Sequence, residues 1–128
     1  MNLNYQTLLA VGIGGFLGAT TRFYINTIVS QRFPSEIPLA TLTVNIIGSF
    51  LIGALIAIFL YYNPTDNTRG FLITGFLGAL TTYSTFAIES YFLLGSSFMY
   101  AIINILLNVF GTIIAAGSGY KLLHYFFK

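Results

Sequence analysis

The chain has 128 residues and a formal net charge of +2, and 56% of its residues are hydrophobic while only 6% are charged. A soluble globular domain carries about 25% charged residues, so this composition predicts an integral membrane protein with a single domain over residues 1–128. The absence of cysteine excludes disulfides and thiolate metal sites, one histidine and three acidic residues are too few for a zinc or di-iron site, and the five scattered basic residues could not follow a nucleic acid backbone.

Four hydrophobic stretches are long enough to cross a membrane, since a spanning helix needs about 20 mostly apolar residues. They cover roughly residues 8–29, 39–61, 71–94 and 99–127. The short connections between them contain Pro, Asn, Asp, Gly and Ser, which are turn-forming residues. We therefore expect an all-α membrane protein in which four transmembrane helices pack as antiparallel neighbours.

The loop charges give a weak preference for one orientation in the membrane. With an even number of spans, Arg69, Lys121 and Lys128 share one side, whereas Arg32 and the deeper Arg22 belong to the other. One interpretation is a fixed topology that depends on few charges. The other is dual topology, in which copies insert in both directions and pair antiparallel.

The first span combines small residues with one arginine. Gly14 and Gly18 form a GxxxG pattern, which lets helix backbones approach closely in lipid. Arg22 lies near the end of this span. Its side chain could extend to the lipid headgroups, or its charge could concentrate anions at the mouth of a pathway.

Polar residues recur at four-residue spacing in the second and fourth spans, where each set shares one helical face. The two sets are Thr41, Asn45 and Ser49, and Asn104, Asn108 and Thr112. Such groups can hydrogen-bond neighbouring helices. We favour a lined pathway, because every one of these side chains includes a hydrogen-bond donor.

Residues 75–86 place two glycines and four Ser or Thr residues in the third span. Polar or broken backbone in a membrane requires burial in protein or contact with a pathway, so we expect a break in this helix at mid-membrane. Tyr83 and Phe86 could pack in the core or turn the positive edges of their rings toward an anion. Glu89 follows as the only acid well inside a span, with either a structural role or a role in the pathway.

These motifs, taken in order, resemble the CrcB/Fluc family of fluoride channels along almost the whole chain. The first-span pattern of Gly14, Gly15, Gly18 and Arg22 is one part of this resemblance. Residues 41–45, residues 75–86 with Glu89, and the fourth-span ladder are the others. The chain differs from the family pattern at Tyr83, where phenylalanine is usual, and at Ala79, where a second glycine is common.

The resemblance implies a passive, fluoride-selective channel in the plasma (inner) membrane, which lowers the cytoplasmic fluoride concentration. It implies an antiparallel, dual-topology homodimer with two pores and a central structural Na⁺, held by main-chain carbonyls of Gly78 and Thr81 from both copies. The pore positions that it implies are Asn45, Tyr83 and Phe86, with a polar track over Thr41, Thr85, Glu89, Asn104, Asn108 and Thr112 and a vestibule at Arg22.

The alternative function is a small proton-coupled multidrug exporter, which is also a four-helix dual-topology dimer. That class depends on a buried carboxylate in the first span, and this first span has none. A helical subunit that transports nothing would leave the two ladders and the broken helix unexplained. An enzyme is not expected, since no set of base, nucleophile or metal ligands can be assembled from these residues.

Overall fold

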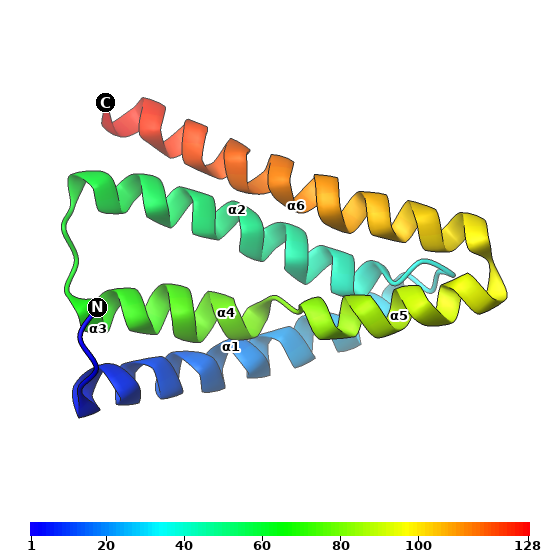
Figure 1. Ribbon diagram of the computed structural model, residues 1–128, viewed down its shortest axis with the longest axis horizontal. Coiled ribbons are helices and arrows are strands. Elements are labelled where there is room, and N and C mark those ends of the chain that lie inside the picture. The colour runs from blue at the N-terminus through cyan, green and yellow to red at the C-terminus, as the bar shows by residue number, and fades with distance from the viewer.

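The computed structural model describes residues 1–128 and is entirely helical apart from short connections. Four long apolar helical stretches run back and forth along the molecule: α1 (Tyr5–Arg32), α2 (Leu39–Tyr61), a composite third helix (Asp66–Ser96) and α6 (Phe98–Phe127) (Figure 1). Each is long and apolar enough to cross a membrane. This confirms the expected all-α architecture with four membrane-spanning helices.

Helix α2 has the expected bounds, whereas the other three helical stretches extend beyond the apolar segments that the sequence suggested. Helix α1, for example, begins at Tyr5, because the side chain of Asn4 accepts a hydrogen bond from the amide of Thr7 and caps the first turn. At 1.5 Å per residue, its 28 residues span about 42 Å, which is the thickness of a bilayer including its headgroups. The extra turns therefore lie where an apolar sequence is no longer required.

The third membrane-spanning segment consists of four consecutive helical elements. They are α3 (Asp66–Arg69), the π-helix η1 (Gly70–Leu77), the short α4 (Gly78–Leu80) and α5 (Tyr83–Ser96). Between α4 and α5 the ribbon opens at Thr81 and Thr82, at the midpoint of the segment (Figure 1). The expected interruption at mid-membrane is therefore present. The π-helical turns before it were not predicted, because the hydropathy of the segment does not depend on how tightly its helix is wound.

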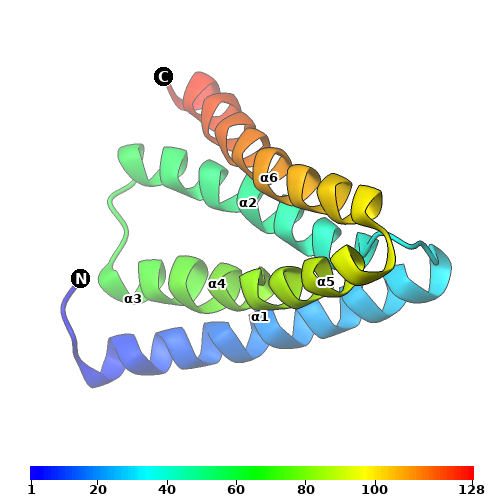
Figure 2. The ribbon, with the colours of Figure 1, turned by 45° about the vertical axis from the view of Figure 1, so that its right-hand side comes forward.

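Glycines set the closest helix contacts, and these contacts lie within one chain. A Cβ atom on Gly14 would collide with the carbonyl oxygen of Phe71, and one on Gly18 would collide with that of Phe76. The same holds between α2 and α6, where Gly53 meets the carbonyl of Ala116. As a result α1 lies against η1 and α4, and α2 lies against α6 (Figure 2).

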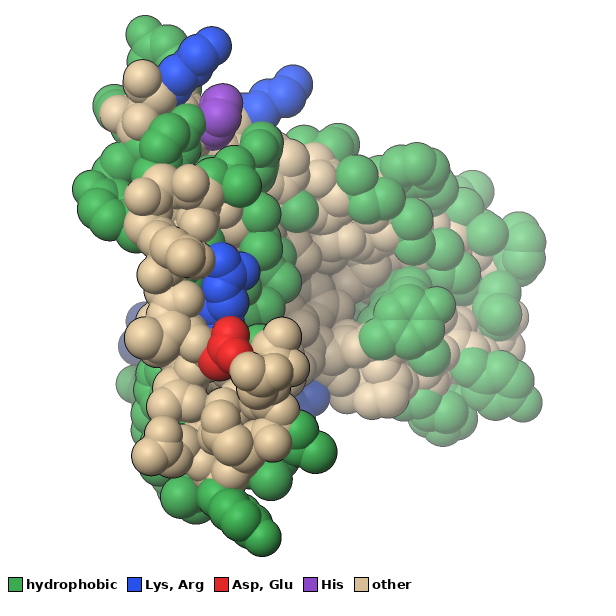
Figure 3. All heavy atoms as spheres, turned by 60° about the vertical axis from the view of Figure 1, so that its left-hand side comes forward, with side chains coloured by type: hydrophobic (Ala, Val, Ile, Leu, Met, Phe, Trp, Pro, Cys, Tyr) green, Lys and Arg blue, Asp and Glu red, His purple; other side chains and the backbone are tan.

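The buried core is small and lies close to the break. Its centre is Val44 of α2 together with Leu77 and Leu80, and only 22 of the 128 residues are buried. Many large apolar side chains face outward, as the space-filling view shows along the sides of the molecule (Figure 3). Lipid accepts such a surface, whereas water would not.

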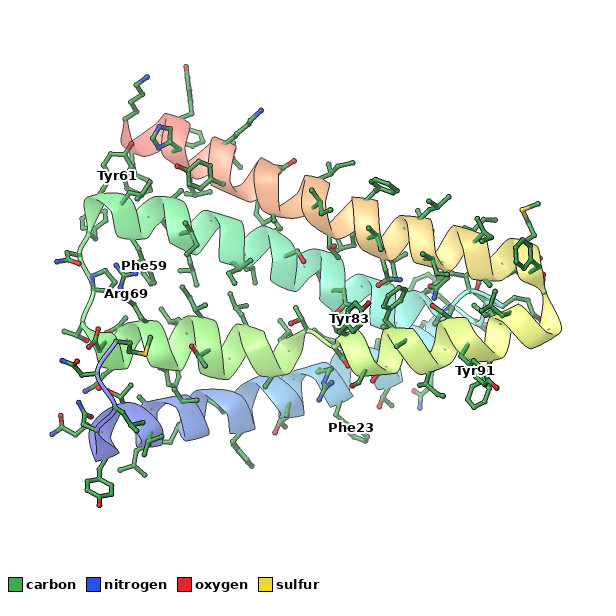
Figure 4. The ribbon with its side chains drawn as sticks, in the orientation of Figure 1. Phe23, Phe59, Tyr61, Arg69, Tyr83 and Tyr91 are labelled. Atoms are coloured by element: carbon green, nitrogen blue, oxygen red, sulfur yellow. The ribbon has the colours of Figure 1, made fainter.

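Both termini lie at the same end of the molecule (Figure 1). Aromatic and polar contacts join neighbouring helices at this end. The guanidinium carbon of Arg69 lies 5.3 Å from the centroid of the Phe59 ring, and the Tyr61 hydroxyl lies 3.0 Å from Nδ1 of His124 (Figure 4). These contacts join α2 to α3 and α6. Aromatic rings with one polar atom suit the membrane–water boundary.

Candidate functional site

The break in the third segment is made by two residues in extended conformation. Thr81 has φ −80° and ψ 158°, and Thr82 has φ −150° and ψ 118°. No residue of the chain has a positive φ. The break therefore needs no glycine conformation, so Ala79, which stands where glycine is common in the resembling family, fits its place in α4 without strain.

The peptide group of Thr82 is paired on both sides with the side chain of Asn45. The Thr82 amide donates to Oδ1 of Asn45 at 2.8 Å, and Nδ2 of Asn45 donates to the Thr82 carbonyl at 3.0 Å. Because a backbone amide can only donate, this pair also fixes which side-chain atom of Asn45 is oxygen. The α2 amide thus supplies the hydrogen bonds that the interrupted helix lacks.

This pairing releases two carbonyls of the break. In an unbroken helix the Thr82 amide would donate to the Gly78 carbonyl, and the Thr85 amide would donate to the Thr81 carbonyl. Here the Thr82 amide is taken by Asn45, and the Thr85 amide donates to Oγ1 of Thr82 at 3.3 Å as an N-cap. The carbonyls of Gly78 and Thr81 therefore lose their helical partners.

A groove of about 460 Å³ lies beside these carbonyls. Its lining includes Ser49 and seven of the predicted sodium and pore residues: Gly78, Thr81, Asn45, Tyr83, Phe86, Asn108 and Thr112. Hard cations such as Na⁺ prefer oxygen ligands, so the chemistry of the released carbonyls fits the expected sodium site.

Asn45 is also the first member of a buried chain of amides. Its second Nδ2 proton is donated to Oδ1 of Asn108 at 3.0 Å, and Nδ2 of Asn108 donates to Oδ1 of Asn104 at 3.1 Å. Nδ2 of Asn104 donates to Oγ of Ser90 at 3.0 Å. The two polar ladders of α2 and α6 are thus joined in a single network.

Thr112 and the other polar positions lie around this network. Oγ1 of Thr112 donates to the Asn108 carbonyl at 2.6 Å. Oγ1 of Thr41 donates to Oε1 of Glu89 at 2.8 Å, while Oε2 of Glu89 is buried without a hydrogen-bond partner. Oγ1 of Thr85 accepts from the Thr82 hydroxyl at 3.0 Å. The Thr41–Glu89 pair joins α2 to α5, the helix that follows the break.

The two aromatic side chains after the break are close but differently placed. The ring centroids of Tyr83 and Phe86 are 5.5 Å apart, with an angle of 68° between the ring planes, so one edge faces the other ring. Phe86 is 7% exposed, whereas Tyr83 is 79% exposed and lies beside the break (Figure 4). One ring is part of the single-chain fold, and the other projects from it.

Several predicted site residues do not reach the groove. They are Arg22, Thr41, Thr85, Glu89 and Asn104. Arg22 is half-buried on α1. The groove is thus lined by the predicted sodium ligands, the pore amide and both aromatic residues, and these five polar residues lie outside it.

Sequence reasoning missed two residues of the network. Thr82 was interpreted only as one of the hydroxyl residues in the break, although threonine is a preferred residue at a helix N-cap. Ser90 is a lone serine in an apolar helix, and nothing in the sequence marks it as the partner of Asn104. Only the packing of α5 against α6 brings the two together.

The chain is similar over most of its length to known membrane proteins. A family model described as "CrcB-like protein, Camphor Resistance (CrcB)" matches residues 9–120. A protein of Sulfurimonas denitrificans named "Fluoride-specific ion channel FluC" is 51% identical over 123 residues, which cover 94% of this chain and 95% of the relative. Relatives with the same name in Nautilia profundicola and Methanococcus maripaludis are 45% and 46% identical, over 93% and 83% of this chain and 94% and 86% of their own lengths.

Proposed function

The chain belongs to the CrcB family, and we propose that it is a fluoride-selective passive channel that exports fluoride across the plasma (inner) membrane. Its relatives carry the name of an ion channel, so the family is not one of enzymes, as the sequence predicted. Four membrane-spanning helices make it a multi-pass membrane protein. Cells take up neutral HF and trap it as the anion, and a passive pore releases that anion down its gradient.

The observation that carries this proposal is the convergence of unlike groups on one groove. Buried amide and hydroxyl groups, aromatic rings and released carbonyls meet at mid-membrane around the break, where a simple helical bundle would be apolar. The pore would pass Asn45, Tyr83 and Phe86. Donors and the positive edges of rings attract a small anion without the strong binding of a full positive charge, which conduction requires.

A polar track would continue the pore away from the groove. Its residues would be Thr41, Thr85, Glu89, Asn104, Asn108 and Thr112, and Arg22 would belong to a vestibule that raises the local concentration of anions. The two hydrogen-bonded sets, Thr41 with Glu89 and Asn108 with its neighbours, support a track in the interior rather than scattered polar positions.

We further propose that the channel is an antiparallel, dual-topology homodimer with two pores along its interface. The groove is only partly enclosed in a single copy, and Tyr83, one of its lining residues, is 79% exposed. The loop charges are close to balanced between the two sides, as dual insertion requires. A second copy is therefore the partner that would cover this face.

In such a dimer the two breaks would meet, and the Gly78 and Thr81 carbonyls of both copies would provide the oxygen ligands of a structural Na⁺. The released state of these carbonyls supports this site. No group of three His, Cys, Asp or Glu side chains comes together in the chain, so a main-chain site suits this protein better than a side-chain site.

The multidrug exporter has no support. Helix α1 contains no acidic residue that could exchange protons for a cationic drug. The relatives described above are named as fluoride channels.

Ion efflux from liposomes tests the proposed function. Purified protein is reconstituted into vesicles loaded with fluoride or with chloride, and release is followed with an ion-selective electrode after the membrane potential is clamped. We expect fluoride release at least about a hundredfold faster than chloride release, a difference of about 2.7 kcal/mol in barrier height. Equal release of the two ions would contradict the assignment.

A further inference from the structure

The buried amide network contains a residue whose position fits neither contact with the ion nor simple helix packing. Asn104 is fully buried, with 0% of its surface exposed, and it does not line the groove. Its side chain is nevertheless completely used. Oδ1 accepts from Asn108, and Nδ2 donates to Ser90.

One series of hydrogen bonds runs through this network in a single direction, beside the bond that Asn45 donates back to the Thr82 carbonyl. The Thr82 amide donates to Asn45, Asn45 donates to Asn108, Asn108 donates to Asn104, and Asn104 donates to Ser90. Each amide side chain is therefore oriented by its neighbour, since turning any one of them would set two donors or two acceptors face to face. Buried chains of this kind reinforce one another and permit a single arrangement.

The network forms a closed loop that begins at the break and returns to the helix after it. It starts at Thr82, crosses to α2 at Asn45 and to α6 at Asn108, and returns at Ser90 to α5, the helix that begins directly after the break. All members are at most 7% exposed. This loop of hydrogen bonds thus links the start of α5 to Ser90, which lies about two turns further along the same helix.

We propose that Asn104 is a positioning residue that sets the selectivity of the pore without touching the ion. By holding Asn108, it holds the Asn45 amide against the Thr82 peptide, and this fixes the directions of Phe86 and of the released carbonyls. This proposal rests on the proposed channel function and narrows the role of one residue of the polar track. Asn104 acts through Asn108 and Asn45.

The structure makes the expected effect specific. If Asn104 is replaced by leucine, Asn108 loses its side-chain acceptor but keeps the main-chain carbonyl of residue 104 at 3.0 Å, and Ser90 loses its donor. The number and branching of the side-chain heavy atoms stay the same. Asn108 is then held less firmly, and the second donor of Asn45 faces a less firmly held partner. The break becomes able to take more than one conformation, so the pore discriminates less sharply between a small anion and a larger one.

The test is the ratio of fluoride to chloride efflux in liposomes, measured at equal amounts of folded, reconstituted protein. We expect Asn104→Leu to lower this ratio at least about tenfold, by raising chloride efflux, lowering fluoride efflux, or both. A merely structural residue would change the number of working channels and hence both fluxes together, leaving the ratio as it is. An unchanged ratio in Asn104→Leu would overturn the proposal.

Two further variants keep the test decisive. Ser90→Ala removes only the last acceptor of the network, so it preserves the fold if Asn104→Leu does not assemble, and we expect it to lower the ratio about threefold. An unchanged ratio in Ser90→Ala would also count against the proposal. Asn26→Leu is the matched control, because it removes an amide from α1 that has no part in the network, and we expect the parent ratio. Absence of fluoride efflux from the parent protein would instead contradict the channel function itself.

Discussion

Tyr83 and Phe86 are two aromatic residues of similar chemistry that differ in burial. The Tyr83 side chain is mostly exposed in a single copy. Phe86 is buried and presents its ring close to that of Tyr83. The departure from the family pattern at position 83 therefore adds a hydroxyl at a place where the fold does not need one.

Tyr83→Phe is expected to conduct fluoride within about twofold of the parent, because the ring edge and its positive quadrupole survive the loss of the hydroxyl. The measurement is fluoride efflux from liposomes at equal reconstituted protein. If the hydroxyl has become a ligand of the ion, efflux will instead fall strongly, since the pore then loses a donor.

Phe86→Ile is expected to reduce fluoride efflux at least about tenfold, because it keeps apolar bulk but removes the ring edge. The substitution also disturbs a buried position, so the melting temperature of the purified variant is recorded beside its efflux. Parent-like conduction by this variant would remove aromatic edges from the mechanism.

At the scale of whole elements, the seam between α1 and the π-helix η1 depends on missing side chains. Gly14 and Gly18 of α1 face the main chain of η1, and Gly75 of η1 faces the carbonyl of Val11. Main-chain atoms cannot rotate away as a flexible side chain can. Any added carbon must therefore move one helix relative to the other.

Gly18→Ala is expected to destabilise the purified protein by about 1–3 kcal/mol, since the new methyl group would overlap the backbone at Phe76. The matched control is Gly12→Ala on the same helix, where an added carbon meets no other atom within 4 Å. The control should be as stable as the parent or more so, because alanine favours a helix over glycine by about 1 kcal/mol. Thermal unfolding in detergent compares the two, and equal loss of stability in both would show that the seam is not the cause.

The sequence predicted the positions of the helices better than the π-helical winding within the third segment or the partners of the break. Hydropathy located the four spans, and the cluster of Gly, Ser and Thr in residues 75–86 located the break, since both signals are local. The partners of the break are not local. Asn45 lies 37 residues before Thr82, and its periodicity with Thr41 and Ser49 predicted a polar face without saying which backbone group that face would meet. The use of Asn45 as a support for the broken helix therefore emerges only from the packing of α2 against the third segment.

For the whole molecule, the orientation of the two copies in the proposed dimer can be tested by linking them. Two copies joined in tandem by a short soluble linker would insert parallel, because each copy has an even number of spans. We expect this fusion to be inactive, since the two breaks cannot then meet as they do in the proposed antiparallel dimer.

A linker that carries one additional transmembrane helix would invert the second copy, and we expect it to restore fluoride efflux. Both fusions are purified and compared with the unlinked protein in the same liposomes, with cross-linking used to exclude assembly between separate fusion chains. Full activity of the parallel fusion would contradict the antiparallel arrangement.

The pairing of the Thr82 peptide with Asn45 of its own chain has a consequence for the order of events in the membrane. The amide and the carbonyl of Thr82 are both satisfied within a single chain, without a second copy. Insertion and association are then separate steps, as in two-stage assembly of membrane helices. Newly made copies in either orientation would persist as finished single units, and the fraction joined would follow their density in the bilayer. Dilution with lipid would separate them without unwinding them.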